Sequence, residues 1–222
     1  MFLYFSDQLI EFYSAFNAFT YITTRGILSA LTALVVSFVF GPKLISLLEG
    51  EKIGEVIRDD GPESHSSKQG TPTMGGLLIL VSIAISTLIW ADLSNTFILA
   101  ILISMLFFGL IGFIDDYMKL SGNKNGMKAV VKFILQLCIA FGAMNYLFYA
   151  SGQPISTEVL IPFTNNIMWD IGWMFLPFAM LVIVGSSNAV NLTDGLDGLA
   201  IMPVVMISIA LGIFAYVSGN FN

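Results

Sequence analysis

The sequence contains few charged residues: Asp, Glu, Lys and Arg make up 11% of its 222 residues, whereas hydrophobic residues make up 56%. Soluble domains carry about 25% charged residues, so this shortage argues against a water-soluble globular fold. The net charge of −6 also lacks the basic excess that nucleic-acid-binding proteins show, and we expect no nucleic-acid partner. Apolar runs long enough to cross a bilayer indicate a polytopic membrane protein instead.

Cysteine and histidine each occur once. The single Cys138 excludes an intrachain disulfide and matches no spacing of metal ligands, so we interpret it as a small apolar residue within a helix. His65 lies in the polar run DDGPESHSSK, and histidine-based catalysis cannot be argued from it. Residues 1–24 contain no Lys or Arg, which are needed in the basic region of a secretory signal, and we therefore expect no cleavable signal peptide.

Long apolar segments dominate what is present. Each approaches the roughly 20 residues that cross about 30 Å of hydrocarbon, and only helices suit such runs because lipid offers the backbone no hydrogen-bond partners. We predict an all-α polytopic membrane protein with a single transmembrane domain over residues 1–222. Its six spans are expected at about residues 24–48, 72–91, 96–118, 129–150, 171–190 and 199–218.

The distribution of Lys and Arg predicts the orientation of these spans. All of these residues except Arg25 lie at or beside the span ends that meet loops 49–71 and 119–128. With six crossings, loop 191–198 shares their side of the membrane. The positive-inside rule assigns that side to the cytoplasm and both termini to the outside. Loop 151–170 would then be external, and the alternation in its stretch ISTEVLIPF suggests a short hairpin or interfacial strand.

The stretch NAVNLTDGLDGLA, at residues 188–200, places a polar side chain at every third position between two apolar segments. We expect Asn188 and Asn191 in the last turn of one helix, a turn at Asp194, and Asp197 as the cap of the next helix. Turn and cap chemistry alone explains the two Asp-Gly pairs about as well as a binding role does. The stretch therefore needs support from other motifs.

The third predicted span ends in GFIDDYMKL. Asp115 lies about 29 Å along the helix from Thr96, which places Asp115 and Asp116 at the membrane boundary. Two adjacent carboxylates on an apolar helix are costly unless they are compensated. Mg²⁺, which takes carboxylate oxygens together with substrate phosphates, would compensate them. A solvated helix end with Lys119 as the local counter-ion is the alternative.

Two further clusters are predicted on the same membrane face. KQGTPTMGG carries Lys68, Thr71 and Thr73, which could hold a phosphate, although the spacing is not that of a Walker A loop; a helix cap is the alternative. In GMKAVVKFILQ, Lys128 and Lys132 share a helix face, and snorkelling would also explain Lys132. Carboxylates, lysines and amides at one boundary suit a Mg²⁺–phosphate substrate, because phosphoryl transfer needs mainly positioning and charge neutralisation.

The motifs KQGTPTMGG, GFIDDYMKL, NGMKAVVKFILQ and NAVNLTDGLDGLA together resemble those of the phospho-N-acetylmuramoyl-pentapeptide transferases. These enzymes form a branch of the polyprenyl-phosphate N-acetylhexosamine-1-phosphate transferases. The resemblance runs from about residue 20 to the end of the sequence. It implies that undecaprenyl phosphate attacks the β-phosphorus of UDP-N-acetylmuramoyl-pentapeptide with Mg²⁺, giving lipid I and UMP in peptidoglycan synthesis. It also implies a multi-pass protein of the bacterial inner membrane, with a cytoplasmic active face and a possible homodimer.

The resemblance also implies roles for residues. Asp115 and Asp116 match the essential acidic pair, which places the metal or deprotonates the lipid phosphate; a covalent phospho-aspartate is the alternative. Lys132 matches a basic position that faces the site. Asn191 is implied as a third metal ligand beside the acidic pair. The residues implied to bind the nucleotide are Lys68, Thr71, Thr73, Asn188, Asn191, Asp194 and Asp197.

Family members are longer, and their additional spans carry a further Mg²⁺-binding aspartate. The sequence thus resembles the N-terminal part of such an enzyme, and we expect the isolated 222-residue chain to be inactive or nearly so. A related transferase that uses another UDP-N-acetylhexosamine, a transporter and a non-enzymatic membrane subunit are the alternatives. The clustering of acids at one membrane face argues against the transporter, since transporters place ionisable groups near the midplane.

Overall fold

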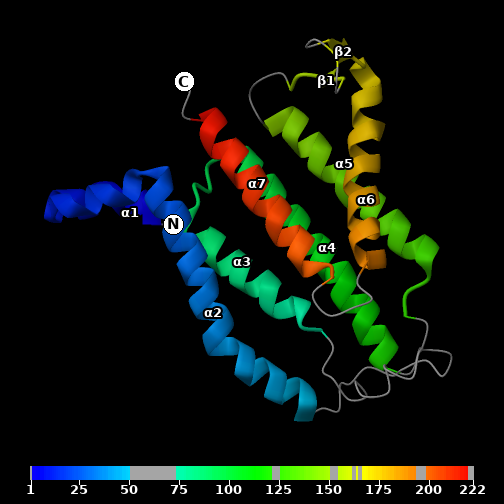
Figure 1. Ribbon diagram of the computed structural model, residues 1–222, viewed down its shortest axis with the longest axis horizontal. Coiled ribbons are helices and arrows are strands. Elements are labelled where there is room, and N and C mark those ends of the chain that lie inside the picture. The colour runs from blue at the N-terminus through cyan, green and yellow to red at the C-terminus, as the bar shows by residue number, and fades with distance from the viewer. Residues whose placement is uncertain are drawn as a thin grey trace. The chain divides into compact units, whose positions relative to one another are not determined.

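The computed structural model describes residues 2–50, 74–121, 126–150, 155–161, 164, 167–193 and 199–219 (Figure 1). The chain divides into two compact units, Met1–Ser156 and Thr157–Asn222. The first unit contains α1 (Phe2–Phe12), the 3-10 helix η1 (Ser14–Thr20), α2 (Ile22–Gly50), α3 (Gly76–Trp90), α4 (Thr96–Leu120) and α5 (Ala129–Ala150). The second contains β1 (Glu158–Leu160), β2 (Met168–Asp170), the 3-10 helix η3 (Gly172–Met174), α6 (Phe175–Thr193) and α7 (Ile201–Gly219).

A helix occupies each of the predicted spans, which confirms the all-α class of a polytopic membrane protein. Within the described residues, five helical segments are long and apolar enough to cross a membrane: α2, α4, α5, α7 and the segment Gly172–Thr193 that contains α6. Helix α3, at the predicted span 72–91, has 15 residues. It is thus about 22 Å long, shorter than the roughly 30 Å of a hydrocarbon core. The orientation of the spans stays a prediction.

Helices α2 and α3 lie side by side (Figure 1) and are joined by two hydrogen bonds. The hydroxyl groups of Ser37 and Ser82 are 3.0 Å apart, and the indole N–H of Trp90 donates to the hydroxyl of Thr32 at 2.8 Å. Ser82 is buried between the helices. Small polar residues let helix backbones approach closely in a membrane, where interhelical hydrogen bonds replace hydrophobic burial as the attraction. The two bonds therefore fix how α3 lies on α2.

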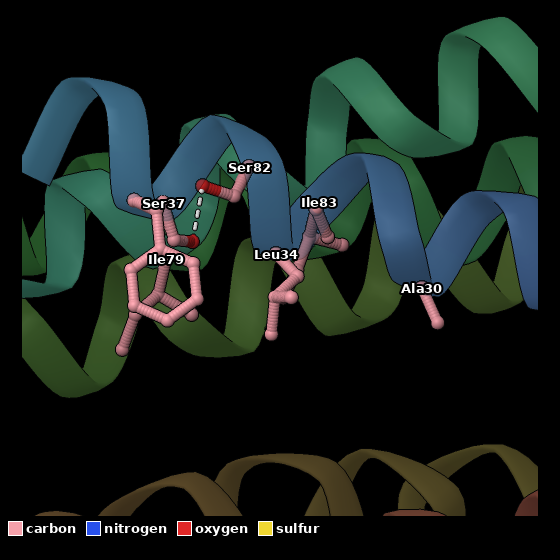
Figure 2. Close-up of a pocket in the computed structure, with 8 residues that line it drawn as sticks. Ala30, Leu34, Ser37, Ile79, Ser82 and Ile83 are labelled. Carbon is pink, nitrogen blue, oxygen red and sulfur yellow. Dashed lines mark hydrogen bonds between the residues drawn. The ribbon is translucent and has the colours of Figure 1, made fainter.

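An open groove of about 490 Å³ lies over these two helices (Figure 2). Its polar pair, Ser37 and Ser82, is already hydrogen-bonded. The groove is otherwise lined by apolar side chains, so it offers no charged group for phosphate chemistry. The remaining lining residues are Ala30, Ala33, Leu34, Phe38, Ile79 and Ile83.

Helix α4 packs between α3 and α5. The contact with α3 depends on Gly109, where a β-carbon would overlap the side chain of Leu80. Helix α5 is tied to α4 at both ends. At one end the hydroxyl of Thr96 donates to the carbonyl of Ala150 at 3.2 Å, and at the other Asp115 binds groups at the start of α5. This antiparallel pair with polar ties at both ends carries the charged residues of interest.

The second unit begins with a two-stranded antiparallel hairpin, in which Glu158 pairs with Asp170 and Leu160 with Met168. This confirms the predicted hairpin in loop 151–170. The hydroxyl of Thr157 and the backbone N–H of Gly172 donate to Asp170 and hold the pKa of that carboxyl below its usual value. Helix α6 follows directly, whereas α7 contains no buried residue, as expected for a helix that faces lipid or a partner.

The start of α4 is fixed by a side-chain cap. The side-chain oxygen of Asn95 accepts hydrogen bonds from the backbone N–H groups of Phe97, at 2.9 Å, and Ile98, at 3.4 Å. These groups have no partner inside the helix. Asp92, in the preceding turn, accepts from the hydroxyl and N–H of Ser94, which lower the pKa of its carboxyl.

Replacing Asn95 with Ala should lower the free energy of unfolding by about 1 kcal/mol, because two backbone N–H groups lose their acceptor. Thermal unfolding of the detergent-solubilised protein, followed by circular dichroism, measures this change. Asn95→Ser is the control, since its hydroxyl restores the cap, and it should melt close to the wild type. Equal melting of the Ala and Ser variants would contradict a capping role for Asn95.

Candidate active site

Two adjacent carboxylates at the end of α4 occupy different environments. An α-helix turns by about 100° per residue, so neighbouring side chains point in different directions. The side chain of Asp115 is 11% exposed and faces α5, whereas that of Asp116 is 41% exposed. One carboxylate therefore belongs to the helix contact and the other to the surface.

Both oxygens of Asp115 are paired. Oδ1 accepts the backbone N–H of Met127 at 2.8 Å. Oδ2 lies 3.1 Å from Nζ of Lys119 and 3.3 Å from Nζ of Lys132. A carboxylate out of water is stable only when such partners compensate its lost hydration. Asp115 thus joins α4, the segment before α5, and α5 itself.

Asp116 has fewer described partners than Asp115, so its carboxylate is freer to bind a ligand. Within the described residues, its carboxylate pairs with Lys119 alone, at 3.1 Å from Oδ1. Lys119 therefore bridges both carboxylates, which confirms its expected role as a local counter-ion. Asp115 is nevertheless buried and not solvated, so the expectation of a simple solvated helix end is wrong for that residue. Asp116 presents an accessible anion beside the ammonium group of Lys119.

The segment before α5 also contributes to this site, and sequence reasoning missed it. Gly126 is buried and has a φ of +62°, a backbone conformation that glycine adopts without strain. A β-carbon at this position would lie 2.5 Å from Oδ1 of Asp115 and 2.9 Å from Cε of Lys119. Gly126 therefore allows the backbone to approach closely enough for the N–H of Met127 to reach Asp115. The sequence offered one indication of this contact, a glycine in the loop between two charged motifs.

The asparagines of the fourth motif lie in the second unit, near the end of α6. Asn191 is in the last turn, as predicted, whereas Asn188 lies one turn earlier because the helix continues to Thr193. The side-chain N–H of Asn188 donates to the carbonyl of Val184 at 2.8 Å, and Asn191 is exposed. They are three residues apart and are thus neighbours on the helix surface. The other predicted site residues lie outside the described residues: Lys68, Thr71, Thr73, Asp194 and Asp197.

The helices and this cluster define a polytopic membrane protein with a compensated charged site at the end of two adjacent spans. Residues 98–222, more than half of the chain, match Glycosyl transferase family 4. Residues 68–80 match the phospho-N-acetylmuramoyl-pentapeptide-transferase signature 1. The chain belongs to Glycosyl transferase family 4, and the signature supports the phospho-N-acetylmuramoyl-pentapeptide transferases as its branch. It is accordingly a phospho-sugar transferase by family, which implies a nucleotide-sugar donor and a polyprenyl phosphate acceptor.

Replacing Gly126 with Ala should destabilise the protein by more than the 1–2 kcal/mol or so that a left-handed backbone costs a residue with a β-carbon. The excess comes from the overlap with Oδ1 of Asp115. A double-mutant cycle on thermal unfolding in detergent separates the two parts. In an Asp115→Ala background the overlap with Oδ1 is gone, and only the contact with the flexible side chain of Lys119 remains. Gly126→Ala should therefore cost less there than in the wild type, close to the backbone part.

The matched control is Gly112→Ala, on the same helix as Asp115 and with open space around the added carbon. It should leave the melting temperature unchanged or raise it slightly, since Ala favours helix over Gly. Additive effects of Asp115→Ala and Gly126→Ala would show that Gly126 and Asp115 are not in contact.

Proposed function

We propose that the protein transfers phospho-N-acetylmuramoyl-pentapeptide from its UDP carrier to undecaprenyl phosphate, releasing UMP and forming lipid I for peptidoglycan synthesis. The observation that carries this proposal is the match of residues 68–80 to the signature of these transferases, within a chain of the wider family. Other members of the family use different UDP-N-acetylhexosamines, and such a substrate is the second candidate. Family membership favours both over a transporter or an inert subunit.

The reaction exchanges one phosphoanhydride bond for another. An oxygen of undecaprenyl phosphate attacks the β-phosphorus of the nucleotide sugar, and the bond from that phosphorus to the oxygen of the departing UMP breaks. Negative charge accumulates on the phosphate oxygens, so the protein must position two anions and neutralise them. Two ammonium groups, those of Lys119 and Lys132, meet at Asp115, and Lys119 also lies beside the accessible carboxylate of Asp116. These charges support this role for the end of α4 and α5.

The two carboxylates support different roles. Because both oxygens of Asp115 are paired, we assign it the role of holding Lys119 and Lys132 in place. Asp116 has an exposed carboxylate and is the group we assign to the substrates. From that position it would hold a metal ion or accept the proton of the lipid phosphate. A covalent phosphate on Asp116 is the alternative route.

The cofactor we propose is Mg²⁺. Within the described residues no three His, Cys, Asp or Glu side chains gather in a group that could hold a metal ion. Mg²⁺ does not need such a cage, because it binds through one or two carboxylates together with substrate phosphates and water. The exposed oxygens of Asp116 fit this requirement, whereas the paired oxygens of Asp115 fit it poorly. Asn191, an exposed residue of α6, is proposed as a further ligand on the family resemblance alone. When bound, Mg²⁺ would neutralise charge on the diphosphate.

We further propose that the protein lies in the bacterial plasma membrane with this site facing the cytoplasm. The support is the gathering of Lys and Arg beside loops 49–71 and 119–128, since such residues favour the cytoplasmic side. UDP-linked precursors are soluble and would approach from that side. The lipid phosphate would approach within the membrane.

An exchange assay tests the reaction. Membranes containing the chain are incubated with Mg²⁺, undecaprenyl phosphate, UDP-N-acetylmuramoyl-pentapeptide and labelled UMP. A second preparation also supplies the C-terminal spans of a family member. Label should enter the nucleotide sugar in at least one of the two preparations. In that preparation Asp116→Asn should abolish the exchange while leaving the melting temperature nearly unchanged, because Asp116 is exposed. Asp115→Asn should reduce both exchange and stability, because Lys132 loses its described ion-pair partner and Lys119 loses one of two.

UDP-N-acetylglucosamine in place of the pentapeptide substrate distinguishes the second candidate. Exchange with that sugar alone would favour a related transferase over the proposed one. Exchange in neither preparation, with either sugar, would contradict a transferase function. Undiminished exchange in Asp116→Asn would keep the reaction but overturn the role assigned to Asp116.

A further inference from the structure

The hairpin of the second unit has one apolar face. Residues directly opposite each other in an antiparallel pair point to the same side, and sides alternate along each strand. Val159 lies opposite Trp169. The pairing continues beyond the strands, where the N–H of Ile161 donates to the carbonyl of Ile167, so this second pair lies on the same face as the first. The next alternate position is Ile171, whose N–H donates to Thr157. The hairpin's apolar face is made of Val159, Ile161, Ile167, Trp169 and Ile171.

The opposite face is mixed. It carries the Glu158 and Asp170 carboxylates, which are paired across the strands in register and both exposed. The opposite face also carries the exposed pair of Leu160 and Met168. On the apolar face Trp169 is 65% exposed and Ile167 is 55% exposed, whereas its other three residues are half-buried, so this face is partly uncovered. Each strand has three residues, and a two-stranded hairpin of this size is marginal in water unless something packs against it. The apolar face therefore needs a cover.

The position of the hairpin in the chain indicates what covers it. The membrane-spanning segment Gly172–Thr193 begins two residues after β2 ends at Asp170, so β2 lies at the boundary between lipid and water. Trp169 and Trp173 flank this start, and tryptophan is enriched at that boundary. Trp173 is 82% exposed. The location of the hairpin and the side chains of its apolar face therefore suit lipid headgroups and the adjoining acyl chains.

We propose that the hairpin's apolar face rests on the lipid bilayer, with Trp169 and Ile167 at the level between headgroups and acyl chains and with Glu158 and Asp170 toward water. A second copy of the chain would be a poorer cover. The five side chains of this face, two on the strands and three just beyond strand ends, cannot supply the roughly 800 Å² that each partner buries in a stable interface.

The consequence concerns α6. Interfacial anchors set the depth and tilt of a membrane helix, and the hairpin is joined to α6 through η3. A hairpin held at one boundary fixes the start of α6, which has 19 residues, or about 28 Å. Its far end, with Asn188 and Asn191, is then held near the opposite boundary. A substrate for these asparagines is assumed only on the basis of the proposed function. The contact of the hairpin with the bilayer does not rest on the proposed function.

Tryptophan fluorescence in vesicles tests the contact. The chain has three Trp residues, so Trp90→Phe with Trp173→Phe leaves Trp169 as the single reporter in the full-length protein. A matched control moves the reporter to the other face by adding Trp169→Phe and Met168→Trp. Phosphatidylglycerol–phosphatidylethanolamine vesicles carry bromine at shallow or deep acyl positions, and iodide serves as the aqueous quencher.

The reporter at position 169 should emit at shorter wavelength, be quenched more by shallow than by deep bromine, and resist iodide. The reporter at position 168 should be quenched by iodide. Equal iodide quenching at both positions would overturn the proposal. Shielding of position 169 from both iodide and bromine would also overturn it, because protein would then be the cover.

Single-cysteine variants give a second measurement that leaves every tryptophan in place. Ile167→Cys and Met168→Cys, each in a Cys138→Ala background, carry an environment-sensitive fluorophore. The proposal requires a lipid-like emission at 167 and a water-like emission at 168, and the same emission at both positions would overturn it. Transferase activity enters neither readout, so failure of the bilayer contact is distinguishable from failure of the proposed function.

Discussion

The neutralisation of Asp115 is the constraint on which the arrangement of α4 and α5 depends. An anion this close to the hydrocarbon region is stable only when cations and N–H groups replace its water. The replacements come from three places in the chain: Lys119 on α4, Met127 before α5, and Lys132 in the first turns of α5. Satisfying one carboxylate thus fixes where α5 begins and how its first turns face α4.

The same constraint separates the two carboxylates. The side chain of Asp115 points toward α5. Because successive residues of a helix are rotated by about 100°, the side chain of Asp116 points away from that contact, where Lys119 is its described partner. Lys119 spans both environments, so a change in charge at Asp116 would be felt by the ammonium that also holds Asp115. The exposed carboxylate, which we propose as a binding group, and the buried carboxylate at the helix contact are therefore electrostatically connected through one side chain.

The sequence predicted the helices and offered a hairpin as one of two alternatives for loop 151–170, because apolar runs and alternation are local signals. It also pointed to the acidic pair and Lys132, because isolated charges in apolar runs are local signals too; their roles stay predictions. It could not predict which aspartate is buried, since that depends on the angle at which α5 meets α4. Nor could it predict the contact of Gly126 and Met127 with Asp115, which requires a left-handed backbone at Gly126. The partner strand of the hairpin, Met168–Asp170, is too short to carry a readable alternation.

Helix length determines where the charged site lies in the membrane. Thr96 and Ala150 tie α4 to α5 at one end, and Asp115 and Lys132 tie them at the other. About 29 Å of helix separates these ties along α4, close to the thickness of the hydrocarbon core. The intervening residues of α4 are apolar, so sliding the pair along the membrane normal would pull one tie into lipid. The charges are thereby held at the end of the helix pair. This placement suits the proposed reaction, in which a phosphate carried on a lipid would meet a soluble nucleotide at the membrane boundary without either leaving its own phase.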